Sequence, residues 1–108
     1  MKLEELKLYS KYKNINNPNI EYIYIGIDKD DGYWFLYKYE NTKTYFSTLK
    51  RYGFDSDKIV NDLNLEIVVY SSDNKYIKGY DWKYCTKQHI EKHFKPILKD
   101  KLKNIINR

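Results

Sequence analysis

The sequence predicts an α+β fold: an antiparallel sheet of about four to five strands, built from two hairpins, with a C-terminal helix packed on one face. Segments 21–40 and 65–84 alternate apolar and polar residues as strands do, and from residue 86 the apolar residues recur at helical spacing. Of the 108 residues, 42% are hydrophobic and 18% are aromatic. That content is sufficient for one domain, spanning 1–108, with its own core.

The first hairpin, 21–40, is the clearest element of the sequence. Three isoleucines alternate with tyrosine and glycine before an acidic loop, and an aromatic run follows the loop. Gly32 after two aspartates is typical of a three-residue hairpin loop that ends in a left-handed residue. The resulting register pairs Ile27 with Phe35 on the core face and leaves Trp34 on the opposite face, where a helix or a partner would cover it.

The residues before this hairpin predict a short helix over 3–13 and a linker over 14–19. Leucines recur near helical spacing in the first segment, and Glu4 and Glu5 would lie in the first turn, where acidic residues are favourable. Pro18 and the asparagines around it break any regular pattern.

After the first hairpin, residues 40–43 predict a second turn and 44–48 a third strand. A short helix is expected over about 55–63, because Asp55 or Ser56 suits its N-cap and the apolar residues that follow share one helical side. The chain therefore returns to helix before the second hairpin.

The second hairpin is expected over 65–84, with a turn at 71–74 between two β-rich runs. Strand alternation places five residues of the second run on one face: Tyr76, Lys78, Tyr80, Trp82 and Tyr84. Lysine among aromatic residues is one form of a base-stacking surface. The same pattern also fits a half-buried strand, which the alternation by itself does not distinguish from a binding surface.

A C-terminal helix is expected over 86–107. Pro96 cannot donate a backbone hydrogen bond, so the helix should kink near 93–95, or divide into two helices with Pro96 in the first turn of the second. Four lysines would form a basic patch beside the apolar side of this helix: Lys92, Lys95, Lys99 and Lys103.

The net charge of +5 is concentrated near the C-terminus, because Lys83–Arg108 contains eight basic and two acidic residues. A basic end favours an acidic partner such as nucleic acid. However, lysine outnumbers arginine 18 to 2, and reading of guanine bases depends mainly on arginine. Sequence-specific DNA binding is therefore disfavoured. Lys, Asn, Ile and Tyr, which have AT-rich codons, make up 53 of the 108 residues, so the composition also indicates an AT-rich genome.

Cysteine content and hydropathy favour a cytoplasmic protein. A single cysteine excludes an internal disulfide, and no apolar run is long enough for a signal peptide or a membrane span. We therefore expect no membrane association, while the oligomeric state stays open.

One group of side chains suggests metal chemistry. Cys85, His89 and His93 are four residues apart and would line one side of a helix, but a closed zinc site needs a fourth ligand, for which no suitable residue is nearby. We therefore expect no metal and no cofactor. The sequence also has no phosphate-binding loop or nucleophile motif, so we expect a protein without enzymatic activity.

These observations favour a small binding protein that acts by occupying a partner macromolecule. An inhibitor, an adaptor or an immunity-type protein encoded by a low-GC bacterium, a phage or a mobile element fits this description, with a protein or nucleoprotein as its partner. Seven residues are expected to contact the partner: Tyr22, Tyr24, Trp34, Tyr76, Lys78, Tyr80 and Trp82. The alternative is a weakly sequence-specific nucleic-acid-binding protein that uses the C-terminal lysines and the aromatic strand.

Overall fold

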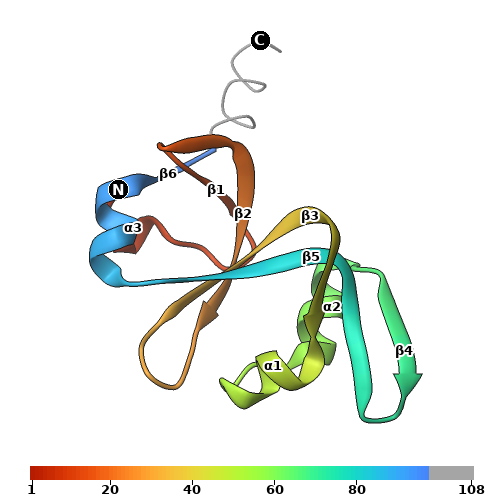
Figure 1. The fold of residues 1–108 in the computed structure, drawn as a ribbon. Coiled ribbons are helices and arrows are strands. Elements are labelled where there is room, and N and C mark those ends of the chain that lie inside the picture. The colour runs from red at the N-terminus through yellow and green to blue at the C-terminus, as the bar shows by residue number, and fades with distance from the viewer. Residues whose placement is uncertain (98–108) are drawn as a thin grey trace, which may run out of the picture.

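The computed structural model describes residues 1–97, and it confirms the predicted α+β class (Figure 1). The described chain forms one antiparallel sheet in the order β4-β5-β3-β2-β1-β6, which has six strands instead of the expected four to five. The strands are β1 (Lys11–Asn14), β2 (Asn17–Ile27), β3 (Tyr33–Tyr45), β4 (Ile67–Ser71), β5 (Asn74–Cys85) and β6 (Phe94–Pro96). The helical elements are the 3-10 turn η1 (Leu3–Glu5) and the helices α1 (Phe46–Arg51), α2 (Ser56–Leu63) and α3 (Lys87–His93).

The two longest strands, β3 and β5, connect the two ends of the molecule. They have 13 and 12 residues and pair along most of their length. Figure 1 shows β1, β6, α3 and the N-terminus at one end of this ribbon, and β4 with α1 and α2 at the other end. The two ends therefore share strands but have different covering elements.

An irregular step in the β3–β5 pairing reverses which face the side chains of β5 occupy. Lys38 pairs with Tyr80 and Lys43 pairs with Lys78, so β3 advances five residues while β5 advances two. In this stretch β3 therefore has three more residues than β5. Because side chains alternate between the two faces of a strand and three is odd, residues of β5 that follow the same alternation lie on opposite faces before and after the step. Gly79 has a φ of 75° at this point, a left-handed conformation that glycine adopts readily.

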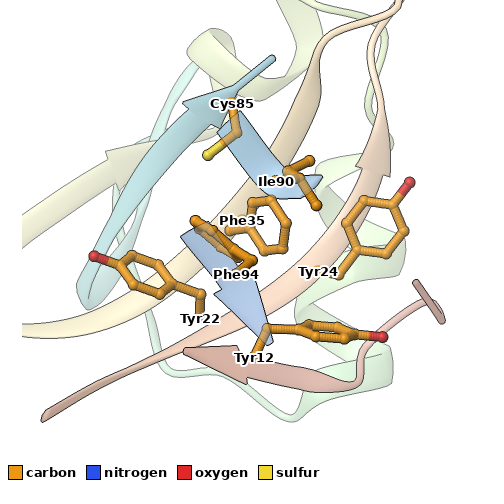
Figure 2. Packing of buried hydrophobic residues seen from close by; sticks show 7 residues of the cluster. All are labelled: Tyr12, Tyr22, Tyr24, Phe35, Cys85, Ile90 and Phe94. Carbon is orange, nitrogen blue, oxygen red and sulfur yellow. The ribbon is translucent and has the colours of Figure 1, made fainter. Parts of the chain in front are cut away.

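Two hydrophobic cores lie on opposite faces of the sheet. The first core, drawn in Figure 2, surrounds Phe35 and is closed by α3, β6 and the N-terminal segment; its buried members are Tyr12, Tyr22, Tyr24, Phe35, Cys85, Ile90 and Phe94. The second core is closed by α1 and α2; its buried members are Ile25, Trp34, Leu36, Leu49, Ile59 and Ile77. The β2–β3 hairpin is therefore buried on both faces.

Asp28 holds the loop of the β2–β3 hairpin with its buried carboxylate. Its Oδ1 accepts hydrogen bonds from the backbone N–H groups of Asp30 (2.8 Å) and Gly32 (2.9 Å), and its Oδ2 accepts one from the indole N–H of Trp34 (2.7 Å). The left-handed residue of the loop is Asp31, with a φ of 65°, and not Gly32 as the sequence suggested. Residue 32 has no room for a side chain, because a Cβ there would collide with the ring of Tyr84.

The predicted register of this hairpin is wrong. Ile27 pairs with Tyr33 instead of Phe35, because the loop has five residues, and a bulge between Tyr24 and Gly26 shifts the register again further along the strands. Phe35 is buried as expected, but Ile27 is 49% exposed and Trp34 is only 1% exposed. The hydrogen bond from Trp34 to Asp28 contributes to the burial of Trp34. Sequence periodicity contains no information about such side-chain hydrogen bonds, so it did not predict this burial.

The N-terminal segment differs from the predicted helix 3–13 and linker 14–19. Only η1 is helical, residues 11–14 form β1, and β2 begins at Asn17, where Asn14 pairs with it across a tight turn. Tyr12 explains the extended conformation, because its buried hydroxyl donates to the carbonyl oxygen of Glu5 (2.9 Å) and accepts from the N–H of Lys7 (2.7 Å).

The middle of the chain continues β3 beyond the expected turn at 40–43. Asn41 is left-handed within an irregular stretch of the strand, and β3 runs on to Tyr45 before α1 begins, so no separate strand covers 44–48. The side chain of Asp55 caps α2 by accepting from the N–H of Lys58 (3.1 Å).

The C-terminal prediction is wrong within the described residues. α3 ends at His93, and the chain then forms β6, which pairs with β1. Burial of Phe94 in the first core drives this change, and Pro96 is tolerated because β6 is an edge strand. The remainder of the expected helix 86–107, from residue 98, lies outside the described residues.

Replacing Asp28 with asparagine should destabilise the protein by about 1–3 kcal/mol at neutral pH, because a charged acceptor of three hydrogen bonds is lost. Burial raises the pKa of Asp28, but bonds from Gly32, Trp34 and Asp30 outweigh burial and lower it overall. The stabilisation is therefore complete above about pH 4 and is lost as pH falls through the lowered folded-state pKa. Urea unfolding of both proteins at pH 6 and pH 3 should show a smaller difference at pH 3; an equal difference would contradict this role.

Candidate functional site

The structure buries four of the seven residues predicted to contact a partner. The exposed fractions of their side chains leave no accessible aromatic surface: Tyr22 5%, Tyr24 8%, Trp34 1% and Tyr76 7%. Tyr22, Tyr24 and Trp34 are buried because the sheet is covered on both faces where β2 and β3 meet. Tyr76 is buried for another reason, since the rings of Tyr45 and Tyr70 contact it on β5. Trp34 is additionally stacked on Trp82, with ring centroids 4.5 Å apart.

The four predicted contact residues on β5 divide between two faces. Tyr80 packs against the second core and Trp82 stacks on Trp34 of that core, whereas Tyr76 and Lys78 point to the opposite face. The sequence placed all four on one face, because simple alternation does not include the step at Gly79.

A different set of side chains gathers on the outer face of the β3–β5–β4 end of the sheet, opposite α1 and α2. We call it the lysine–tyrosine face. Lys43 and Tyr45 come from β3, Tyr76 and Lys78 come from β5, and Tyr70 comes from β4. A groove of about 650 Å³ beside these residues is also lined by Lys38 at the step in the sheet, although Lys38 pairs with Tyr80 and is therefore on the strand face of the second core.

The tyrosines of this face form a row centred on Tyr76. The ring of Tyr45 lies 5.5 Å from that of Tyr76, and the ring of Tyr70 lies 5.7 Å from it on the other side. A hydrogen bond with Tyr70, followed by burial, raises the pKa of Tyr76. Tyr76 is buried, whereas Tyr45 is 37% and Tyr70 is 64% exposed. The row therefore has a fixed centre and two accessible rings.

The lysines lie among these tyrosines. Lys43 and Lys78 are directly opposite each other on β3 and β5, and the ammonium group of Lys43 lies 5.0 Å from the centroid of the Tyr76 ring. Lys78 contacts Glu66 at 3.7 Å, in a pair whose side chains are 60% and 72% exposed. A pair this exposed contributes little stability, so Lys78 can exchange Glu66 for another anion.

The direct opposition of Lys43 and Lys78 has a cost in stability. The nearby carboxylates are those of Glu66, which pairs with Lys78, and Glu40, which lines the groove. Like charges directly opposite on neighbouring strands destabilise a sheet. The cation–π contact to Tyr76 offsets part of this repulsion. An anion bound between Lys43 and Lys78 would remove the remainder.

The predicted C-terminal basic patch is not a helical stripe in the described residues. Lys92 is exposed on α3, but Lys95 lies on β6, where it pairs with Lys13 of β1. Lys99 and Lys103 lie outside the described residues.

Cys85, His89 and His93 do not form one site. Cys85 is buried in the first core, and burial raises the pKa of its thiol to about 11. His89 Nε2 lies 3.4 Å from the side-chain nitrogen of Asn14, and burial, with the positive charge of Lys83, lowers the pKa of His89. Among residues 1–97, no three His, Cys, Asp or Glu side chains are grouped to hold a metal ion.

A second hollow, of about 400 Å³, lies between α1, α2 and the β4–β5 turn. It contains both acidic and basic side chains: Asp55, Asp57, Asp73, Lys50 and Lys75. Asp55 caps α2 and Lys75 lies 5.6 Å from the ring centroid of Phe46, so both have structural contacts. The lysine–tyrosine face is therefore the better candidate for recognition of a charged partner.

Comparison of the chain with protein-family models, with curated proteins and with solved structures finds no match. No helix within residues 1–97 has the length and apolar character needed to cross a membrane. The geometry of the described residues is therefore the basis for the candidate site.

Sequence reasoning identified Tyr76 and Lys78 but missed Lys43, Tyr45 and Tyr70. A signal for the β3 residues was present, because Lys43 and Tyr45 alternate with the buried Thr44. Reading 40–43 as a turn separated these residues from the strand to which they belong. Tyr70 was assigned to a strand, but its neighbour on the sheet depends on pairing between β4 and β5.

The step at Gly79 can be tested with two substitutions. Gly79→Ala should destabilise the protein by about 1–2 kcal/mol, because alanine disfavours the left-handed conformation, and no atom lies within 4 Å of the added Cβ to change the result. Gly79→Asn should cost less, since asparagine tolerates this conformation, as Asn41 and Asn64 do here. Urea denaturation measures both; an alanine variant as stable as wild type would contradict the assignment.

Proposed function

We propose that this protein acts without catalysis, by binding an anionic macromolecule on the lysine–tyrosine face. The observation that carries the proposal is the directly opposed pair of Lys43 and Lys78, surrounded by tyrosines, on a part of the sheet that no described helix covers. An anionic partner would convert this repulsion between two lysines into an attraction to both.

Exposure of the tyrosines supports recognition in preference to a purely structural role. Tyr70 is 64% exposed, although burial of a large aromatic side chain is among the strongest contributions to stability. A row of rings with two accessible members provides contact area for a partner at small conformational cost. The lysine–tyrosine face therefore combines charge and aromatic area in one place.

The proposal retains the binding class expected from the sequence and changes the residues that carry it. Tyr22, Tyr24 and Trp34 have structural roles in the two cores, and only Tyr76 and Lys78 of the expected contact set belong to the proposed surface. We propose that the protein acts by occupying its partner, as an inhibitor or adaptor does.

Retention on immobilised heparin, a polyanion, tests the proposal. The double substitution Lys43→Gln, Lys78→Gln should lower the salt concentration needed for elution, because two contacts to anionic groups are lost. The matched control Lys29→Gln, Lys50→Gln removes two exposed lysines elsewhere and should have a clearly smaller effect.

Both double variants have the same net charge, so a difference between them reports position and not total charge. Their thermal unfolding should be measured first, and the Lys43, Lys78 variant should be at least as stable as wild type once the repulsion is removed. Equal elution shifts for the two variants, or no retention of the wild-type protein at low salt, would contradict the proposal.

A further inference from the structure

We infer that the anionic partner is single-stranded nucleic acid, with bases stacked on Tyr45 and Tyr70 and phosphates beside Lys43 and Lys78. This inference rests on the function proposed above and specifies its ligand. The ligand chemistry follows from three features of the lysine–tyrosine face: the central position of its lysines, the arrangement of its tyrosines, and the chain's low arginine content.

The lysines occupy the centre of the face and not its border. Lys43 lies over the central ring of the row, and Lys78 is its cross-strand neighbour. Protein–protein interfaces are depleted of lysine in their cores, whereas binding of single-stranded nucleic acid regularly places lysine next to aromatic rings. An acidic protein is therefore the less suitable ligand for this arrangement.

The tyrosines provide two stacking positions on either side of a fixed ring. Tyr45 and Tyr70 each contact Tyr76, and the hydrogen bond between Tyr70 and Tyr76 limits the orientations of the Tyr70 ring before any ligand binds. Preorganised rings lose less entropy when a base stacks on them. Bases in a duplex are already stacked on each other, so a single strand is the form that can use these rings.

Weak sequence specificity follows from the side chains present. The chain has 2 arginines among 20 basic residues, and within residues 1–97 no arginine lies on the lysine–tyrosine face. Bidentate recognition of guanine is thus not available there, while stacking accepts any base. Lys38 lines the same groove as Tyr76 and Lys78, so it adds a positive charge near the proposed position of the phosphates.

The opposite side of the same end of the molecule is less favourable for an anionic strand. The hollow between α1, α2 and the β4–β5 turn contains three aspartates, Asp55, Asp57 and Asp73, beside Lys50 and Lys75. Its carboxylates outnumber its lysines, so an anionic strand is expected to prefer the outer face, where Lys43 and Lys78 are directly opposed.

Fluorescence anisotropy of a labelled oligothymidine of about 12 nucleotides tests the inference, a length in the range of known single-strand sites. Tyr70→Ala should weaken binding by about tenfold, the loss expected for one stacked base. Tyr70→Phe should retain most of the affinity, because the ring remains. Tyr84→Ala, which removes a 49% exposed tyrosine from the opposite face, is the matched control and should leave the affinity unchanged.

Salt dependence and two competing ligands complete the experiment. The slope of log affinity against log salt should decrease by about 1.4 in the Lys43→Gln, Lys78→Gln variant, at about 0.7 per lost phosphate contact. A duplex of the same length and polyglutamate should both bind more weakly than the single strand. Confirmation requires the tyrosine effect, the reduced slope and this order of ligands.

The contrary results separate the inference from the proposed function. An unchanged affinity for Tyr70→Ala, or equal binding of duplex and single strand, would overturn the inference. Tighter binding of polyglutamate than of oligothymidine would overturn it in favour of an acidic protein, while the anion-binding function would stand. Absence of binding to every polyanion, heparin included, would overturn both.

Discussion

The irregular step in the pairing of β3 and β5 determines which side chains of β5 are buried and which are exposed at the β4 end of the sheet. Between Lys38 and Lys43 the chain uses five residues against two on the partner strand, and Gly79 supplies the left-handed conformation that this needs. One continuous sheet can therefore bury Ile77 on the same side as Tyr80. Without the step, Tyr76 and Lys78 would point toward α1, and no lysine–tyrosine face would exist.

The two ends of the sheet also differ in how many of their faces are covered. At the end of the β2–β3 hairpin, cores on both faces enclose Phe35 and Trp34, and the Asp28 carboxylate ties the loop to the second core. At the β4 end, helices cover a single face, so Tyr70 stays exposed and the lysines oppose each other. The accessible tyrosines of this end, Tyr45 and Tyr70, therefore lie on the face that the helices leave uncovered.

Several elements of the fold could be predicted, because strand alternation, turn residues and helix caps depend mainly on residues that are close in the sequence. The isoleucine alternation identified β2, the turn residues at 71–74 identified the β4–β5 connection, and Asp55 identified the start of α2. The predictions failed where a distant contact decides the conformation. Tyr12 is extended because its hydroxyl contacts the η1 segment, and α3 ends because Phe94 enters the first core.

The candidate site was predicted only in part, because Tyr76 and Lys78 come from one strand and their neighbours come from two others. Amide chemical-shift mapping with oligothymidine identifies the residues that a nucleic-acid strand contacts. The largest changes are expected at Lys43, Tyr45, Tyr70 and residues 76–79. Changes centred on Lys92 and Lys95, or no changes at the lysine–tyrosine face, would contradict the proposed site.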